Sequence, residues 1–393
     1  MISISDAISI VKANGKPLLQ KTIKKVEKAG GYLLFEDILS PINMPPFRQS
    51  AMDGYALNSH DDLSYQLIGE IKAGDGHQPI LKKGEAVRIF TGAAVPDSAN
   101  AVMMQEKVIQ DGKNIITIEH QIQLEQNIRP LGEQVKTGDL ALKKGTKLTP
   151  AAIGYLISLG ITEVSVFKKP NIAIVTTGNE LIEAGQDLSY GKIYESNSKM
   201  LLSTLYSLKF YDVTLYKVED DYSKTVDILN TAINDNDLVL ITGGISVGDY
   251  DFVGKALNEL LVEELFYKVK QKPGKPLFYG KKNDTQIFAL PGNPAAALSC
   301  FYVYVYIALQ KLMNRDAIEL PRIEAKSISK FKKKGDRPQF LKAIYNNGEV
   351  EILEGQNSSM LQTFALSNAL VYAPETVTEI NKEDTIEVIQ LPV

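Results

Sequence analysis

The sequence predicts a multidomain α/β-plus-β protein, in which a central parallel-sheet domain lies between a β-rich N-terminal part and a C-terminal β-barrel. Residues 171–313 alternate apolar strand-like runs with helical runs, and this βαβαβ order favours a parallel sheet with helices on both faces. Before residue 170 and after residue 321, short strand-like pieces are separated by Gly, Pro and Asn. We expect four domains: a linker-type domain (1–40 and 130–170), a β-rich domain (41–129), the α/β domain (171–320) and the barrel (321–393).

Composition and charge favour a globular protein of a reducing compartment. The chain has 393 residues, of which 44% are hydrophobic and 23% charged, enough for several ordinary cores. The net charge of −4 gives no basic field for nonspecific binding to nucleic acid. The single cysteine, Cys300, cannot form an internal disulfide, and the N-terminus lacks the pattern of a signal peptide. We therefore expect a cytoplasmic protein that binds no nucleic acid.

The two flanking parts are predicted from short strands and one helix. YQLIGEI, AVRIF, AVMMQEKVI and IITIE are the strand-like pieces of the β-rich domain. Thr149 and Pro150 mark the start of a helix over 149–161, because Thr caps helices and Pro fits the first helical position. After residue 321, FLKAIY, EVEIL and ALVYA alternate apolar and polar residues, which is typical of a small barrel or sandwich.

Three apolar runs define the parallel strands of the central domain: NIAIVTT, DVTLYKVE and DLVLIT. The segments between them, SNSKMLLSTLYSLK and DDYSKTVDILNTAIND, have helical spacing and helix-start residues. Right-handed crossovers bring the loops after all three strands to one edge of the sheet.

An uncharged segment of seventeen residues, Pro294 to Gln310, is just shorter than a typical membrane span. It contains three tyrosines, a serine and a glutamine, and it begins inside a Gly-Pro loop. We interpret it as a buried helix that closes the α/β domain, with a membrane span as the lesser alternative. Cys300 lies within it, and a small buried hydrophobe is the better interpretation than a nucleophile.

The loops that follow the parallel strands contain acidic and glycine-rich groups. Glu180 follows the first strand, Asp220 and Asp221 follow the second, and TGGISVGDYDF (242–252) follows the third. Backbone N–H groups of a glycine-rich turn bind anions, whereas aspartates repel them. A hard divalent cation such as Mg²⁺, bridging carboxylates and phosphate oxygens, resolves this conflict. The alternative, a solvated rim of helix caps, is equally compatible with the residue types.

Further motifs have both a binding and an ordinary turn interpretation. KPGKP (272–276) places two lysines on a stiff turn, which suits phosphate or an oxyanion such as molybdate. ALPGNPAAA (289–297) leads into a helix whose first N–H groups form an anion site. SAMDGYA, RIFTGA and IRPLGEQVKTGD lie in the N-terminal part, and each taken alone is best interpreted as a turn. The three histidines lie in loop-like contexts, so neither a catalytic triad nor a zinc site is expected.

Taken in order, SAMDGYA, RIFTGA, TGNEL, GGISVGDYDF, KPGKP, LPGNP and GQNSSML make the chain resemble the MoeA-type molybdopterin molybdenumtransferases, which are related to the gephyrin E domain. The resemblance covers essentially the whole chain. It implies insertion of molybdate into adenylylated molybdopterin, with release of AMP and a requirement for Mg²⁺. It also implies an α/β domain like the molybdopterin adenylyltransferase fold, and a homodimer whose cleft combines the α/β domain of one subunit with the β-rich domain of the other. The implied partners are adenylylated molybdopterin, molybdate and molybdopterin adenylyltransferase. No association with a membrane is implied.

The resemblance also implies roles for individual residues. Asp251, Glu180, Lys272 and Lys275 would be catalytic, and Asp251, Glu180 and Asp220 would order Mg²⁺. The implied substrate-binding residues are Asp53, Thr91, Arg129, Glu133, Thr177, Gly243, Gly244, Ser246, Gly248, Pro291, Gly292 and Pro294.

The chain departs from the family pattern at a few positions. Gln134 in RPLGEQ stands where an acid is expected, and an amide cannot hold a cation by charge. Glu195 replaces an aspartate, and Lys342 stands where arginine is common, which would weaken a bidentate anion contact. Two alternative functions remain open. One is an adenylyltransferase acting on molybdopterin, and the other is a scaffold that uses the same fold to bind partners.

Overall fold

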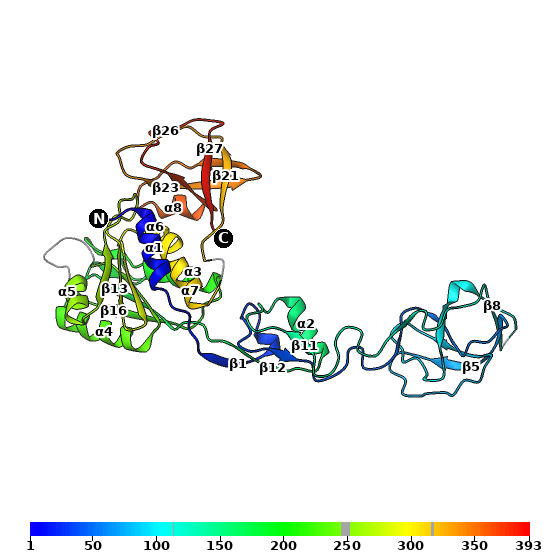
Figure 1. Cartoon of the computed structure of the whole chain (residues 1–393). Helices are drawn as coiled ribbons and strands as arrows, with labels where there is room; N and C mark the ends of the chain where they lie inside the picture. Colours follow the sequence, from blue (N-terminus) through cyan, green and yellow to red (C-terminus); the bar gives the residue numbers. More distant parts are fainter. Residues whose placement is uncertain (113, 245–251, 316–317) are drawn as a thin grey trace. The chain divides into compact units, whose positions relative to one another are not determined.

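The computed structural model describes the whole chain except residues 113, 245–251 and 316–317. The chain forms two compact units (Figure 1). One consists of Met1–Gln20 and Lys168–Val393, and it contains the parallel-sheet domain and the barrel. The other consists of Lys21–Phe167 and contains the β-rich sheet.

A six-stranded sheet forms the centre of the first unit, in the order β16-β13-β17-β20-β19-β18. In chain order its strands are β13 (Ile172–Thr177), β16 (Val213–Val218), β17 (Leu238–Thr242), β18 (Glu263–Tyr267), β19 (Phe278–Lys282) and β20 (Thr285–Leu290). The first four strands in the sheet order are parallel, and three of them, β13, β16 and β17, are the parallel strands that the sequence predicted. The pair β19 and β18 extends the sheet with antiparallel strands. A two-residue parallel pair, β14 (Leu181–Ile182) and β15 (Ile193–Tyr194), lies between β13 and α3 in sequence.

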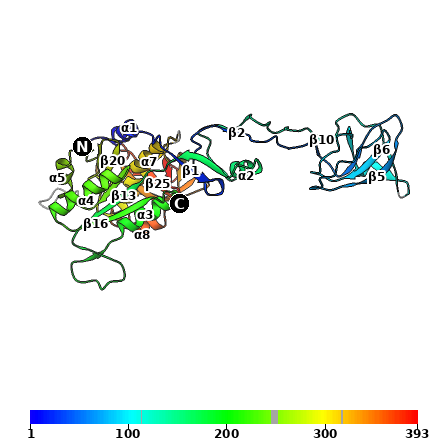
Figure 2. The ribbon, with the colours of Figure 1, turned by 90° about the horizontal axis from the view of Figure 1, so that it is seen from below.

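Helices cover both faces of this sheet, as Figures 1 and 2 show. Alternate residues of β13 enter two separate cores, Ile172 and Ile174 in one, Ala173 and Val175 in the other. The first core includes residues of α1 (Ile4–Asn14), α3 (Asn197–Ser207), α6 (Pro294–Cys300) and α7 (Tyr306–Leu312). The second includes residues of α4 (Tyr222–Asp235) and α5 (Phe252–Glu259). All of β13 is therefore buried, which explains its continuous apolar sequence.

The uncharged segment is a core helix of the α/β domain. α6, the π-helical turn η3 (Phe301–Val305) and α7 form one helical stretch, Pro294–Leu312. It is long and apolar enough to cross a membrane by composition, but 89% of its most apolar window is buried inside the protein. α1, from the range expected to belong to the linker-type domain, packs into the same core.

A closed five-stranded barrel completes the first unit and confirms the predicted C-terminal barrel. Its strands follow the order β21 (Arg322–Ser327), β24 (Glu349–Ile352), β23 (Gln339–Asn346), β25 (Ala369–Ala373) and β27 (Thr385–Gln390). The short strands β22 (Phe331–Lys332) and β26 (Glu379–Ile380) pair beside it, and α8 (Leu361–Ala365) follows β24.

The second unit is dominated by a six-stranded sheet in the order β7-β4-β6-β5-β9-β8. Its strands are β4 (Gly54–Leu57), β5 (Ser64–Ile71), β6 (Glu85–Ile89), β7 (Ala101–Met104), β8 (Val108–Gln110) and β9 (Ile115–Ile118), with η2 (Gln105–Lys107) between β7 and β8. Three further pairs are β1 (Lys21–Lys25) with β12 (Glu163–Phe167), β2 (Ile38–Leu39) with β11 (Leu140–Leu142), and β3 (Gln49–Ser50) with β10 (Ile128–Arg129). η1 (Val26–Lys28) and α2 (Pro150–Ser158) complete it, and the Thr149 hydroxyl caps α2, as predicted.

Candidate active site

The largest concentration of predicted site residues surrounds a cavity of 610 Å³ in the first unit. β13 lies between β16 and β17, so the chain crosses from β13 to β16 on one side and then from β16 back to β17 on the other. Open α/β sheets bind ligands at such a point of reversed strand order. The cavity is lined by Thr177, Glu180, Leu181, Ile193, Asn197, Thr242, Gly243, Gly244, Lys272, Pro273, Gly274, Lys275, Pro276, Pro291, Gly292, Asn293, Ala296, Arg337 and Ser358.

The predicted residues divide into three groups. Those gathered around the cavity are Thr177, Glu180, Gly243, Gly244, Lys272, Lys275, Pro291 and Gly292. Pro294 is the first residue of α6 and Asp220 follows β16, and neither lines the cavity. Ser246, Gly248 and Asp251 lie outside the described residues. Asp53, Thr91, Arg129 and Glu133 belong to the second unit.

Two glycines close one end of the cavity against β13. Gly243 and Gly244 have φ of 90° and 63°, a region that side chains rarely adopt. A Cβ at Gly243 would lie 2.5 Å from the Thr177 carbonyl oxygen, and a Cβ at Gly244 would lie 2.8 Å from the Thr177 hydroxyl oxygen. The turn therefore requires glycine at both positions, for conformation and for space.

Two buried oxygen atoms at the same end lack hydrogen-bond partners among the described residues, Thr177 Oγ1 and Asn197 Oδ1. The amide nitrogen of Asn197 donates to Thr242 Oγ1 and to the Gly292 carbonyl, both at 2.8 Å. A carbonyl only accepts, so Gly292 fixes which side of the amide carries the nitrogen. Both residues are more than nine-tenths buried, and an unsatisfied polar atom there costs about 1–3 kcal/mol. Such atoms are typical of binding sites, where a ligand or ordered water satisfies them.

Three cationic side chains also line the cavity, Lys272, Lys275 and Arg337. None of them pairs with a carboxylate in the part of the chain that the structure describes. Arg337 Nη1 donates to the Gln271 carbonyl at 3.0 Å, which directs the guanidinium to the KPGKP turn. Unpaired cations that converge on one cavity favour an anionic ligand.

Buried contacts hold the KPGKP turn, and its two lysine side chains make no hydrogen bond or ion pair with the residues that the structure describes. Gly274 has φ of 86°, and a Cβ there would lie 2.4 Å from Cys300 Sγ. The buried Gln271 amide donates to the Gly274 carbonyl at 3.0 Å and accepts a hydrogen bond from Tyr304. Burial raises the pKa of the Cys300 thiol to about 12, so the thiol is packing and not a nucleophile, as the sequence indicated.

Of the described acidic residues expected at a metal site, Glu180 lines the cavity and Asp220 does not. The exposed Glu180 carboxylate lies over Gly178, where a Cβ would come within 2.6 Å of Glu180 Oε2. Asp220 Oδ2 accepts a hydrogen bond from the Asn179 N–H at 3.1 Å. Outside residues 113, 245–251 and 316–317, no three His, Cys, Asp or Glu side chains form a cluster that could hold a metal ion. Asp251, the third predicted ligand, lies in one of these ranges, so the Mg²⁺ site stays a prediction.

The cavity residues without a role predicted from the sequence include Asn197, Arg337 and Ser358. Asn197 ends the segment IYESN (193–197), which contains Glu195, and Ser358 lies in GQNSSML, but the sequence predicts no role for either side chain. Ser358 Oγ accepts a hydrogen bond from Asn293 Nδ2 at 2.9 Å, which joins the barrel to the start of α6. Glu195 in IYESN has a structural contact, since its carboxylate accepts from the Ser198 N–H and hydroxyl at 2.8 and 2.6 Å.

In the second unit, two of the predicted residues are in contact. Asp53 Oδ1 accepts hydrogen bonds from the Thr91 N–H and hydroxyl, both at 2.7 Å. The backbone bond from Thr91, then its hydroxyl and then the charge of Arg88 hold the pKa of Asp53 below its usual value. Arg129 bonds Gln49 at 3.4 Å, and the Glu133 N–H bonds the Pro130 carbonyl at 3.2 Å, with no described contact to Asp53.

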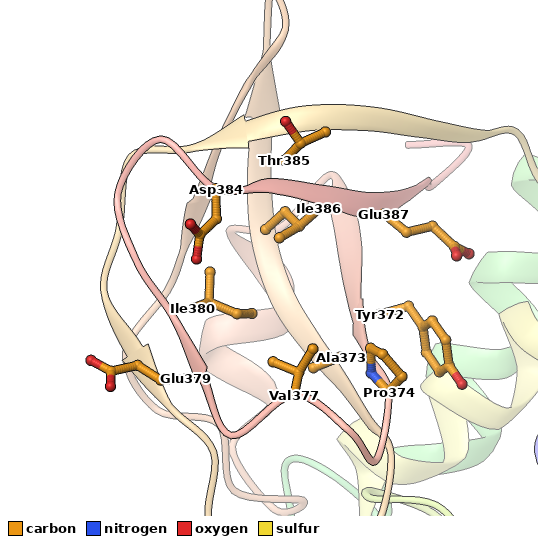
Figure 3. A pocket seen from close by; sticks show the side chains of 10 residues that line it. All are labelled: Tyr372, Ala373, Pro374, Val377, Glu379, Ile380, Asp384, Thr385, Ile386 and Glu387. Atoms are coloured by element: carbon orange, nitrogen blue, oxygen red, sulfur yellow. The ribbon is translucent and has the colours of Figure 1, made fainter.

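A second cavity, of 370 Å³, lies on the barrel and contains no predicted site residue (Figure 3). Val377, Ile380 and Ile386 give it an apolar lining, and Glu379 and Glu387 extend away from them (Figure 3). It lacks the cations, the glycine-rich turn and the unsatisfied buried atoms of the first cavity. The first cavity is therefore the candidate active site.

Comparisons with known proteins agree with this architecture. Three family models match in order: the MoeA N-terminal region (domain I and II) over residues 2–160, a probable molybdopterin binding domain over 173–311, and the MoeA C-terminal region (domain IV) over 324–391. The molybdopterin molybdenumtransferase of Haemophilus influenzae is 34% identical, with 92% of each chain covered. That of Staphylococcus epidermidis is 31% identical over 99% of this chain and 95% of its own.

A solved structure has the same fold over its full length. The molybdopterin biosynthesis MoeA protein of Pyrococcus horikoshii superposes with a TM-score of 0.82 at 30% sequence identity, covering 99% of this chain and all of its own. The resemblance seen in the sequence motifs is confirmed by these matches. The chain belongs to the MoeA family of molybdopterin molybdenumtransferases.

Proposed function

We propose that the protein inserts molybdate into adenylylated molybdopterin and releases AMP. The observation that supports this most directly is the cavity at the sheet edge, whose lining combines three cations with glycine backbone and unsatisfied oxygens. Molybdate suits Lys272, Lys275 and Arg337, and the organic substrate suits the glycine backbone and the unsatisfied oxygens. In the reaction, two molybdenum–sulfur bonds form as the two thiols lose their protons and one molybdate oxygen leaves with them as water. A water molecule cleaves the bond that joins AMP to the molybdopterin phosphate, so that AMP leaves and the phosphate of molybdopterin is freed.

The residues around the cavity offer a role for each part of this reaction. Lys272 and Lys275 offset the charge of molybdate and of the departing AMP phosphate, which stabilises a transition state in which charge develops. Gly243 and Gly244 allow backbone to approach the phosphate closely. Pro291 and Gly292 form the turn before α6, and they shape the side of the cavity nearest Asn293.

A requirement for Mg²⁺ is part of the proposal. The exposed Glu180 carboxylate has no partner among the described side chains and faces the cavity, so it fits the single carboxylate that Mg²⁺ often takes together with phosphate oxygens. When bound, Mg²⁺ would neutralise charge on the phosphates. Glu180 would hold it, together with Asp251 and Asp220 as the sequence predicts.

The proposal is tested by single-turnover incubation of the purified protein with adenylylated molybdopterin, Mg²⁺ and molybdate. We expect AMP and molybdenum cofactor to appear together and in equal amounts, and only when molybdate is present. AMP release at the same rate without molybdate, or adenylylation of molybdopterin from ATP, would contradict the proposal and favour the adenylyltransferase alternative.

Replacing Thr177 by valine is expected to separate binding from stability. The Thr177 hydroxyl has no hydrogen bond to lose within the described structure, so Thr177→Val should leave the free energy of unfolding unchanged or raise it slightly. If the hydroxyl binds the organic substrate, its affinity should fall about tenfold. Thermal unfolding and calorimetric titration with adenylylated molybdopterin check the two expectations. A stable variant with unaltered affinity would remove Thr177 from the site.

We also propose that the active protein is a homodimer in which Asp53, Thr91, Arg129 and Glu133 serve the site of the other subunit. Asp53→Asn and the double variant Lys272→Met/Lys275→Met should then each be inactive alone. In a refolded equimolar mixture, half of the dimers contain one intact site of two, so about a quarter of the wild-type activity should return. A mixture as inactive as its components, despite confirmed formation of mixed dimers, would contradict the shared site.

A further inference from the structure

Lys342, in β23 of the barrel, is a buried lysine whose ammonium contacts a single loop. It is 2% exposed, and its Nζ donates to the carbonyl oxygens of Gly355, Asn357 and Met360 at 2.7, 3.1 and 3.1 Å. An ammonium has three N–H donors, so this loop, residues 355–360, uses all of them. No acidic or basic side chain of the described residues hydrogen-bonds or pairs with Nζ. Lys342 is absent from the cavity lining, so the expected anion contact at this position is not made.

The contact with Lys342 determines how Ser358 is presented. In a trans peptide the C=O and N–H point in opposite directions. Because the Asn357 carbonyl faces Lys342, the N–H of Ser358 points away from Lys342, and Ser358 lines the cavity whereas Lys342 does not. This N–H donates to no described group. The Ser358 hydroxyl oxygen accepts from Asn293, so its own proton is available to a ligand.

The loop has a second attachment that does not depend on the ammonium. Gln356 Oε1 accepts from the Lys342 N–H and Gln356 Nε2 donates to the Lys342 carbonyl, both at 2.9 Å. A change of the Lys342 side chain therefore leaves the loop attached to β23. It frees three carbonyls that were oriented by a charge-assisted hydrogen bond, the stronger kind. A change of the Lys342 side chain therefore alters the orientation of the Ser358 peptide group.

We propose that Lys342 is a positioning residue for oxyanion binding. Its ammonium holds the carbonyls of residues 355–360 inward, so that the N–H and hydroxyl of Ser358 complete an anion site with Lys272, Lys275 and Arg337. A buried cation behind the loop also strengthens the positive potential, since charges in a low-dielectric interior are weakly screened. The inference rests on the proposed function, in which this anion is molybdate.

Three variants of the full-length protein test the proposal by calorimetric titration with molybdate. Lys342→Met keeps the long side chain and removes the charge, and we expect molybdate to bind about tenfold more weakly. Lys342→Arg should restore most of the affinity. Lys169→Met is the matched control, because Lys169 is also buried and donates to a carbonyl, that of Lys209, at 2.5 Å, but does not line the cavity. Lys169→Met should bind molybdate as the wild type does.

The pH profile distinguishes positioning by charge from a general structural role. Burial lowers the pKa of Lys342 to about 8, so the ammonium is charged below that pH and loses its proton above it. Molybdate affinity of the wild type should therefore fall between about pH 7 and pH 9.5, while Lys342→Arg, which stays charged, should show a smaller fall.

Equal pH profiles for the wild type and Lys342→Arg would overturn the proposal, and so would unaltered molybdate affinity in Lys342→Met. If Lys342→Met does not fold, the comparison with Lys342→Arg still decides. A wild-type protein that binds no molybdate would overturn the proposed function, and this inference with it.

Discussion

Replacing Lys272 and Lys275 together by methionine is expected to lower kcat/KM for molybdate-dependent AMP release by at least about 1000-fold. Each donor aimed at developing charge in a water-poor site contributes about 100-fold or more to the rate. The fold should survive, because the turn is tied to the barrel through backbone groups. The Lys272 N–H donates to the Pro338 carbonyl and the Lys272 carbonyl accepts from the Phe340 N–H, both at 2.9 Å.

The matched control for this double variant is Lys270→Met. Lys270 lies two residues before the turn and pairs with Glu375 at 2.7 Å, outside the cavity. It should keep turnover within about twofold, because pairs of this exposure contribute little. Comparable losses in the control and the double variant would mean that the lysines act through general charge and not through the cavity.

Glu180→Gln is expected to reduce turnover by about 100-fold with no change in thermal stability. The substitution keeps the shape of the side chain and removes the charge that would hold Mg²⁺. In the described part of the chain the carboxylate makes no hydrogen bond or ion pair that could be lost. Steady-state kinetics over a range of Mg²⁺ concentrations should show a raised requirement for Mg²⁺.

Glu183→Gln provides the comparison, since Glu183 is close in sequence but does not line this cavity. Its turnover and its Mg²⁺ requirement should match those of the wild type. A Glu180→Gln variant with the same Mg²⁺ dependence as the wild type would show that Glu180 does not hold the metal.

The fold was predicted well where the sequence pattern reflects burial. The runs that became β13 and β17 are apolar up to the threonines at their ends because helices cover both faces of the sheet, and this is visible in the sequence. The antiparallel pairing of β18 and β19 was not predicted. The direction of a strand depends on the end of the sheet at which the preceding connection enters it, and this leaves no local pattern in the sequence. The cap at Thr149 was predicted because it depends on neighbours three residues apart.

The candidate site was predicted in part, and the missing residues have a common reason. Residues that follow a strand, such as Thr177 and Glu180, are placed at the sheet edge by topology alone. Arg337 and Ser358 reach the cavity only because the barrel packs beside the KPGKP turn, which no spacing in the sequence encodes. Lys342 had been interpreted as a weakened anion contact, since sequence gives the residue type but not the direction of its side chain.

Molybdate binding by the cations of this cavity can be observed by anomalous diffraction at the molybdenum edge from crystals soaked in molybdate. We expect one strong peak in contact with Lys272, Lys275, Arg337 and Ser358, and loss of that peak in the Lys272→Met/Lys275→Met variant. A peak elsewhere on the protein with this cavity empty, or a peak that persists in the double variant, would contradict it.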